Sequence, residues 1–263
     1  MRSFENHAKR AMLAGTTVLC MGLRQARTAD IAPIVQACGF DALYLDMEHS
    51  PISIETVSAI CTAAVGFGVT PLVRVPGHGS EHLSRALDGG AMGIIVPHVD
   101  TAEQAQAMVR AGKYPPIGHR SVMGSGPALG YRNMPLGEVN DFVNRETLMI
   151  AMLETPTGIA NAEAIAAVPG IDMLLIGSND LCTEMGIPGQ LRHPELLAAY
   201  ETTARACQRH GKILGVGGIR GDTELQTRLI AMGARFVIAG NDVTYLMQAA
   251  RQDADKLRAL AAP

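Results

Sequence analysis

Two apolar runs in the sequence each end in a carboxylate: Met149-Ile150-Ala151-Met152-Leu153-Glu154 and Met173-Leu174-Leu175-Ile176-Gly177-Ser178-Asn179-Asp180. If the two runs are consecutive parallel strands, Glu154 and Asp180 lie side by side at the carboxyl edge of the sheet, where α/β proteins place their chemistry. Two neighbouring carboxylates repel each other, and a divalent cation relieves that repulsion. Hard oxygen ligands favour magnesium or manganese as this cation.

Short apolar runs alternate with segments of helical periodicity along the whole chain. The eight strand-like runs are 17–23, 42–45, 71–75, 93–96, 149–153, 173–176, 213–216 and 236–239. The helix-like segments are 54–65, 81–87, 102–111, 159–167, 194–210 and 224–232. This alternation predicts a parallel sheet with crossover helices. Eight repeats in 263 residues favour a single (β/α)₈ TIM barrel over residues 1–263 rather than an open sheet.

Glycines precede several of the expected strands, and two segments stand outside the repeat. Gly39, Gly90 and Gly233 are expected to end helices in the left-handed conformation. The long stretch 98–147 is expected to cover the active site, as long irregular insertions often do. Residues 244–262 are expected to form an amphipathic helix that caps the barrel or packs on a partner subunit.

Composition excludes several classes of protein. The net charge is −3, and lysine and arginine are scattered singly, so no basic surface for nucleic acid or a membrane is expected. The five cysteines are well separated and lack a C-x-x-C pair, which argues against disulfides and a zinc site. Neither an apolar signal segment nor a membrane-spanning run is found. We expect a cytoplasmic enzyme that acts on small molecules.

A candidate base follows the second expected strand, in Asp46-Met47-Glu48-His49. A histidine at the carboxyl end of a barrel strand, with acids one and three residues before it, suits a general base that a carboxylate holds in one tautomer. Alternatively, Asp46 or Glu48 caps the next helix and His49 is solvated.

Arg74 lies among apolar residues at the end of the third expected strand, Pro71-Leu72-Val73-Arg74-Val75. Burying a guanidinium is costly unless it meets an anion. We expect that anion to be a substrate carboxylate or a developing enolate; the alternative is a structural salt bridge to Asp46 or Glu48.

Glu154 and Asp180, taken singly, could be helix-capping acids. Together with His49 and Arg74 they supply a base, a cation and two metal ligands at one rim, a combination that predicts a metal-assisted site. The turn Gly177-Ser178-Asn179 is expected to offer backbone N–H groups to a substrate carboxylate.

Other features bear on rival mechanisms. The four lysines avoid the expected strand ends, which disfavours Schiff-base chemistry. Glycine-rich turns at 215–221 and 238–242 keep open a phosphate-binding isomerase or synthase. The remaining histidines lack metal-ligand spacing and are expected at the surface: His78, His82, His98, His119, His193 and His210.

The ordered motifs resemble the HpcH/HpaI family of class II, metal-dependent 2-oxo-acid aldolases over nearly the whole chain. The resemblance rests on 39–49, on 71–76, on Tyr114-Pro115-Pro116-Ile117-Gly118-His119-Arg120, on Leu153-Glu154-Thr155 and on 176–181. It implies reversible cleavage of a 4-hydroxy-2-oxo acid to pyruvate and an aldehyde through a metal-bound enolate. Related carbon–carbon lyases, decarboxylases and condensing enzymes of the same superfamily, and a binding or assembly protein without turnover, stay open.

The resemblance also implies a role for each site residue. Glu154 and Asp180 would bind Mg²⁺ or Mn²⁺, with Co²⁺ also acceptable, His49 would act as the base, and Arg74 would stabilise the enolate. Asp46 would orient the base, and Asp88 would approach a neighbouring subunit's site and raise the basicity of its histidine. Members of the family are commonly trimers of dimers with an exchanged C-terminal helix, so a hexamer is expected.

The chain departs from the best-known members where the substrate is contacted. Met152 stands where a glutamine is frequent, Asn179 follows Ser178 where Pro-Ala is common, and Ser121 follows Arg120 where glycine is usual. These changes leave the pyruvate-handling residues in place and leave the aldehyde undefined.

Overall fold

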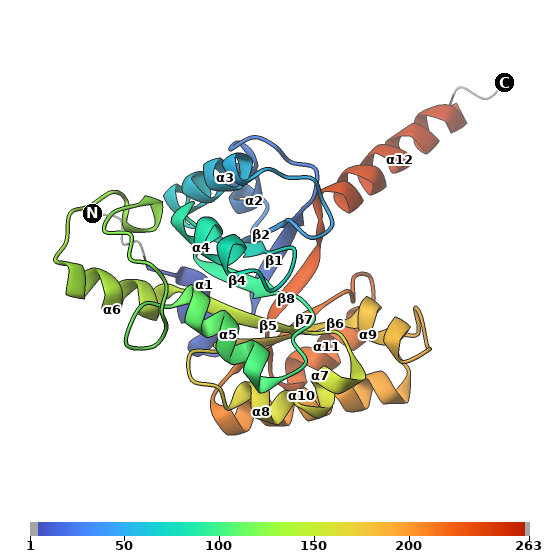
Figure 1. Cartoon of the computed structure of the whole chain (residues 1–263). Helices are drawn as coiled ribbons and strands as arrows, with labels where there is room; N and C mark the ends of the chain where they lie inside the picture. Colours follow the sequence, from blue (N-terminus) through green and yellow to red (C-terminus); the bar gives the residue numbers. More distant parts are fainter. Residues whose placement is uncertain (1–4, 261–263) are drawn as a thin grey trace.

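A computed structural model of the protein describes residues 5–260 and shows a closed barrel of eight parallel strands (Figure 1). Each strand pairs with its successor, and β8 pairs with β1. The strands are β1 (Val18–Leu23), β2 (Ala42–Asp46), β3 (Thr70–Arg74), β4 (Gly93–Val96), β5 (Leu148–Leu153), β6 (Met173–Gly177), β7 (Ile213–Gly217) and β8 (Ala234–Asn241). The predicted TIM barrel is confirmed, and each predicted run contains or overlaps one of these strands.

Helices surround the barrel and connect its strands. They are α1 (His7–Leu13), α2 (Ile31–Ala37), α3 (Ile54–Gly66), α4 (Ser80–Asp88), α5 (Ala102–Gly112), α6 (Leu136–Glu146), α7 (Pro156–Ala160), α8 (Ala162–Ala166), α9 (Ser178–Glu184), α10 (Pro194–His210), α11 (Thr223–Met232) and α12 (Asp242–Leu260), with a 3₁₀ turn, η1, at Pro127–Leu129. The single helix predicted at 159–167 is divided at Asn161, whose side-chain amide donates to the Asp100 carbonyl. The predicted left-handed glycines are confirmed, with φ of 81° at Gly39, 105° at Gly90 and 115° at Gly233.

The core has two parts, as the barrel geometry requires. Alternate strand residues fill the barrel, among them Tyr44, Leu72, Ile150 and Phe236. The intervening residues pack outward against the helices in a larger apolar cluster. Helix α1 also joins the interior cluster, through Ala8 and Met12. These layers leave only the strand ends free to carry polar side chains.

The segment 98–147 does not form the predicted cover over the site of its own chain. It contains α5 and α6, and the stretch between them is tied to residues that immediately precede β5: the Lys113 ammonium donates to the carbonyls of Asn144 and Thr147 at 2.7 and 2.5 Å. The Tyr114 N–H also donates to the Asn144 side chain. Since β5 begins at Leu148, these bonds hold residues 113–147 at the amino end of the barrel, opposite the predicted site. The first residues of the segment, from His98 on, follow β4 at the carboxyl end.

Helix α12 extends away from the barrel (Figure 1). None of its side chains is buried, and Leu246, Met247, Leu257 and Leu260 are exposed. The expected helix is present, but it does not cap the barrel of its own chain; packing on a partner subunit stays a prediction. Among residues 5–260, no helix combines the length and the apolarity of a membrane span.

Candidate active site

Glu154 is a buried carboxylate, and one of its two oxygens accepts no hydrogen bond from the described residues. It follows β5 and is 1% exposed. Its Oε2 accepts the His98 backbone N–H at 3.2 Å, whereas Oε1 has no hydrogen-bond partner among residues 5–260. Burial raises the pKa of Glu154 to about 7; His98 and Arg74 act in the opposite direction, and Asp180 adds repulsion. The pKa is raised chiefly because burial outweighs the favourable charges of His98 and Arg74.

The strand register places the two acids together. Leu153 pairs with Ile176, so Glu154 lies beside Gly177, and Asp180 is in the first turn of α9. A Cβ added at Gly177 would lie 2.5 Å from Glu154 Oε1, and therefore only glycine leaves room for the carboxylate there. Asp180 itself is exposed. The pair is thus one buried and one accessible carboxylate on neighbouring strand ends.

The donor set fits a hard divalent cation. Both side chains offer oxygen, Glu154 has a free buried oxygen atom, and Asp180 raises its pKa. The part of the chain that the structure describes holds no cluster of three or more His, Cys, Asp or Glu side chains arranged for a metal. Two carboxylates suit Mg²⁺, which usually keeps several waters and binds through one or two carboxylates and the substrate.

The pH dependence of stability tests the state of Glu154. Because its folded-state pKa lies above the ordinary value, Glu154 stabilises the metal-free protein at low pH, and this contribution is lost as the pH rises from about 4.5 through 7. We expect metal-free wild type to lose roughly 3 kcal/mol relative to Glu154→Gln between pH 4.5 and 8, measured by urea unfolding. Saturating Mn²⁺ is expected to remove most of this loss. Parallel curves for the two metal-free proteins would contradict the assignment.

Arg74 forms the centre of an ion-pair network. It is 4% exposed and directly opposite Asp46 in the β2–β3 register. Its Nε and Nη2 donate to the two carboxylate oxygens of Asp46 at 2.9 and 2.7 Å, and Nη1 lies 2.9 Å from Glu48 Oε2. Burial alone would lower the pKa of Arg74, but Asp46 raises it above its ordinary value. The structural salt bridge of Arg74 to Asp46 and Glu48, which the sequence left open as an alternative, is therefore present. It orients the Arg74 guanidinium at the cavity.

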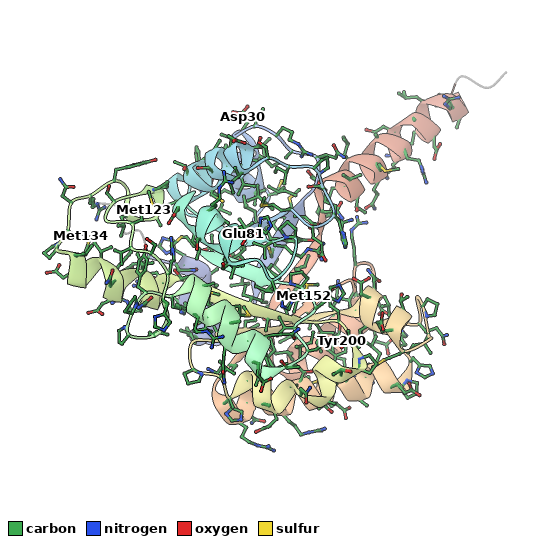
Figure 2. The ribbon with its side chains drawn as sticks, viewed as in Figure 1. Asp30, Glu81, Met123, Met134, Met152 and Tyr200 are labelled. Atoms are coloured by element: carbon green, nitrogen blue, oxygen red, sulfur yellow. The ribbon has the colours of Figure 1, made fainter. Side chains whose placement is uncertain are left out.

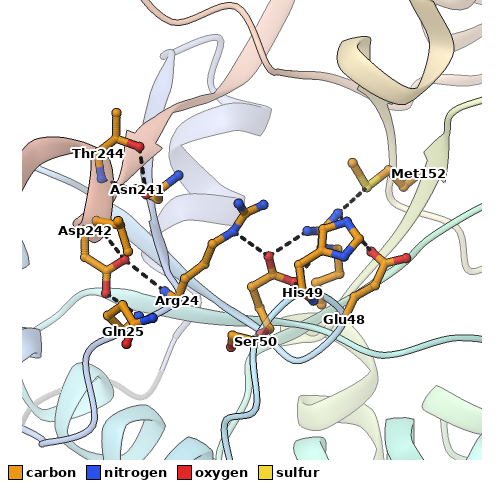
Figure 3. Close-up of polar contacts among 12 residues, drawn as sticks. Arg24, Gln25, Glu48, His49, Ser50, Met152, Asn241, Asp242 and Thr244 are labelled. Atoms are coloured by element: carbon orange, nitrogen blue, oxygen red, sulfur yellow. Dashed lines mark hydrogen bonds and ion pairs between the residues drawn. The ribbon is translucent and has the colours of Figure 1, made fainter. Parts of the chain in front are cut away.

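Asp46 contacts the backbone of His49 rather than its ring. Burial opposes its charge, but the bonds to Arg74 hold the pKa of Asp46 below its ordinary value, helped by the His49 N–H and by Arg24. The His49 N–H donates to Asp46 Oδ1 at 3.2 Å, whereas the ring Nε2 lies 3.9 Å from Glu48 Oε2 (Figure 3). The nearby acid is therefore the one that directly precedes His49, whose side chain is 49% exposed.

A cavity of about 510 Å³ opens at this end of the barrel, and most of the predicted residues line it. Those present are His49, Arg74, Met152, Gly177, Ser178, Asn179 and Asp180. The Met152 sulfur lies 4.0 Å from Arg74 Nη1. The Ser178 hydroxyl, in contrast, is buried and bonds to Tyr200 and the Gly217 carbonyl, so it is not free to bind a ligand.

Three predicted residues do not line this cavity. Asp46 and Glu154 are buried just behind it, against Arg74 and Gly177, whereas Asp88 lies elsewhere in the chain. Asp88 ends α4, binds Arg120 Nη2 at 2.6 Å, and lines a separate hollow together with Met123. Met123 and Met152, the latter from the active-site cavity, are well separated in Figure 2. A role for Asp88 in catalysis would therefore require a neighbouring subunit.

Several residues at the site were not predicted. His98, expected at the surface, is 52% exposed, and its ring Nε2 lies 3.8 Å from Glu154 Oε2 and 3.9 Å from Glu48 Oε1. Its φ of 49° turns its N–H toward Glu154. Arg24 and Asn241 also line the cavity. All three residues lie at or just after the end of a strand, and this position in the sequence could have identified them as site residues.

The fold and the site define a barrel with two neighbouring acids at its carboxyl edge, and comparisons with known proteins identify its family. The family model HpcH/HpaI aldolase/citrate lyase matches residues 21–249. The chain is 41% identical over 253 residues to the 4-hydroxy-4-methyl-2-oxoglutarate aldolase of Chaetomium globosum, covering 95% of this chain and 94% of the relative. It is 36% identical to the hydroxypyruvate/pyruvate aldolase of Chromohalobacter salexigens over 88% of this chain and 90% of the relative.

Solved structures point to the same group. The HpcH/HpaI aldolase from Desulfitobacterium hafniense superposes with a TM-score of 0.90 at 30% identity, covering 95% of this chain and 96% of that one. Citrate synthase SbnG gives a TM-score of 0.83 at 27% identity, with coverage of 98% and 99%. The chain therefore belongs to the HpcH/HpaI aldolase/citrate lyase family. It is a class II pyruvate aldolase, a carbon–carbon lyase, and aldolases of this family depend on a divalent metal. This membership favours the aldolase over the phosphate-binding isomerase or synthase.

Proposed function

We propose that the cavity cleaves a 4-hydroxy-2-oxo acid to pyruvate and an aldehyde or ketone, with Glu154 and Asp180 holding Mg²⁺ or Mn²⁺. The observation that carries this proposal is the unpartnered, buried Oε1 of Glu154 next to Asp180, on the rim where His49 and Arg74 line the same cavity. A cation bound there would act as a Lewis acid that favours formation of an enolate from the 2-oxo acid. Co²⁺ would satisfy the same oxygen ligands.

The protein side chains would move the proton and stabilise the charge. In cleavage, His49 accepts the proton of the 4-hydroxyl group, the C3–C4 bond breaks, and its electron pair stays with the three-carbon fragment as an enolate. The 4-hydroxyl carbon leaves as a carbonyl, and a proton is returned to C3 to give pyruvate. Arg74, fixed by Asp46 and Glu48, stabilises the enolate oxygen as its charge develops.

The neighbours of the base support its role. Glu48 Oε2 lies 3.9 Å from the His49 ring Nε2, so a carboxylate adjoins the proposed base. Asp46 holds the His49 backbone and the Arg74 guanidinium at once. We also propose a homo-oligomer of paired subunits, in which α12 packs on a partner and Asp88 reaches a neighbouring site; the exposed apolar side chains of α12 support it.

Exchange of the methyl protons of pyruvate with deuterium tests the enolising half of the site without an aldehyde. We expect exchange in the presence of Mn²⁺ and its loss on chelation, and we expect pyruvate release from a panel of 4-hydroxy-2-oxo acids. The panel includes 4-hydroxy-4-methyl-2-oxoglutarate, for which the relatives from Chaetomium globosum and Hapsidospora irregularis are named. Exchange that is insensitive to chelation would overturn the metal assignment. A binding or assembly protein would show neither exchange nor release.

A further inference from the structure

The loop that follows β1 is fixed to the start of α12 by one carboxylate. Asp242 accepts the backbone N–H groups of Arg24, Gln25 and Ala26 at 3.0, 2.9 and 2.7 Å (Figure 3). It also accepts the N–H of Val243, in its own helix, at 2.9 Å. Four donors on one carboxylate hold the backbone of Arg24 in a single position at the cavity rim.

The Arg24 side chain is only partly used within the protein. Its Nε donates to Asp46 Oδ2 at 2.9 Å, and the side chain is 37% exposed and lines the cavity. Among residues 5–260, neither Nη1 nor Nη2 makes a hydrogen bond, and in Figure 3 the dashed line reaches only Nε. Asp46 already receives two bonds from Arg74. The free end of the Arg24 guanidinium is therefore available to a ligand.

Two further donors lie on the same side of the cavity. Arg220 has no carboxylate within 4.0 Å in the described part of the chain; it donates to the Gln248 side chain and stacks on the Tyr245 ring at 4.9 Å. Asn241 accepts the N–H and hydroxyl of Thr244 with its Oδ1, at 3.0 and 2.8 Å. Its amide NH₂ is consequently the group left to donate.

These donors line the side of the cavity formed by β7, β8 and β1, and this side adjoins Arg74, because Arg24 Nε and Arg74 Nη2 share Asp46 Oδ2. Arg24, Arg220 and Asn241 come from the ends of β1, β7 and β8, whereas Arg74 and the two acids come from β3, β5 and β6. One cavity of about 510 Å³ spans both groups, and it is larger than pyruvate requires. A wall of two guanidinium groups and an amide matches a carboxylate, which accepts paired N–H bonds from arginine.

We propose that Arg24 binds a carboxylate on the acceptor part of the substrate, so that the enzyme prefers aldols formed from pyruvate and a carbonyl compound that is itself an acid. Asp242 is the positioning residue for Arg24. This inference rests on the proposed function, because it identifies the acceptor of that same reaction. The substrate class is a 4-hydroxy-2-oxo acid with a second carboxylate attached to C4.

Paired substrates test the proposal. Holoenzyme with Mn²⁺ is assayed for pyruvate release from 4-hydroxy-2-oxoglutarate and from its 5-amide, which differ only in the acceptor carboxylate. We expect wild type to prefer the acid, and Arg24→Gln to lower the ratio of the two kcat/KM values by about 10- to 100-fold, the range for a hydrogen bond to a charged group. Arg24→Lys is expected to keep part of the preference. Asp242→Ala is expected to lower the ratio through a higher KM for the acid.

The ratio separates substrate recognition from general damage. If Arg24 serves only to support Asp46, Arg24→Gln lowers both kcat/KM values equally and the ratio stays constant, which would overturn the proposal. Arg27→Gln is the matched control, since Arg27 is exposed, lies on the same loop and donates only to the carbonyls of Arg24 and Ala26. Equal use of acid and amide by wild type would also reject the inference while leaving the aldolase intact. If the enzyme released pyruvate from neither substrate and also failed to exchange the methyl protons of pyruvate, the proposed function itself would be rejected.

Discussion

Replacing His49 by alanine is expected to lower kcat for pyruvate release by about 100- to 10,000-fold, the usual contribution of a general base. The same change should leave the affinity for Mn²⁺ near that of wild type, because the cation is assigned to Glu154 and Asp180. His49 is half exposed, so its removal leaves no buried cavity and the fold is expected to persist. Steady-state kinetics and calorimetric titration of the metal-free protein with Mn²⁺ measure the two effects separately.

A second histidine provides the control for this experiment. His82 lies on α4, has an exposed side chain, and within residues 5–260 its ring has one acidic neighbour, Glu81 at 3.7 Å. His82→Ala is expected to match wild type in rate and in Mn²⁺ affinity. A near-normal rate for His49→Ala would show that another group takes the proton. His98, whose ring lies between Glu48 and Glu154, would then be the next candidate.

Replacing Asp180 by alanine is expected to abolish metal-dependent activity and to weaken Mn²⁺ binding at least about 100-fold. Removal of a residue that hydrogen-bonds to a metal ligand typically lowers the affinity for the metal by about 10- to 100-fold. Removal of a ligand itself should lower that affinity at least as much. Asp180 is exposed in the first turn of α9, so the change is expected to leave the fold intact. Removing Asp180 also removes its repulsion of Glu154, and therefore the pKa of Glu154 should fall.

The same helix supplies a matched acid. Glu184 is exposed at the end of α9, about one turn beyond Asp180, and Glu184→Ala is expected to retain both activity and Mn²⁺ affinity. Mn²⁺ binding is measured by calorimetry, and circular dichroism checks the fold of each variant. Full activity or wild-type affinity in Asp180→Ala would contradict its role as a ligand.

The local sequence pattern predicts the barrel and the site at its carboxyl edge, because neighbouring residues in the sequence show where each strand ends. An apolar run that stops at a charged residue identifies both a buried strand and its edge, and this is why 149–154 and 173–180 indicate two adjacent acids. The same argument places His49 and Arg74 at the rim. Each of these residues lies at the predicted edge in the structure.

Side-chain partners could not be predicted in the same way, because they depend on rotamers and on contacts between distant segments. Asp46 and Glu48 are equally plausible neighbours of His49 along the chain, and only the β2–β3 register, which sets Arg74 against Asp46, leaves Glu48 near the ring. The left-handed backbone of His98 is likewise a tertiary effect, since its N–H meets a carboxylate 56 residues away.

The sequence by itself determined the closed barrel, the pair of acids at its carboxyl edge and the family, because apolar periodicity and short motifs are local properties of the chain. Tertiary structure alone decided that residues 113–147 of the insertion lie at the amino end, that α12 stands apart from the barrel, and that Asp242 holds Arg24 at the cavity. These features depend on which residues, far apart in the sequence, form ion pairs and hydrogen bonds with one another. A carboxylate at position 242 therefore positions Arg24 at the cavity only once β8 has closed against β1.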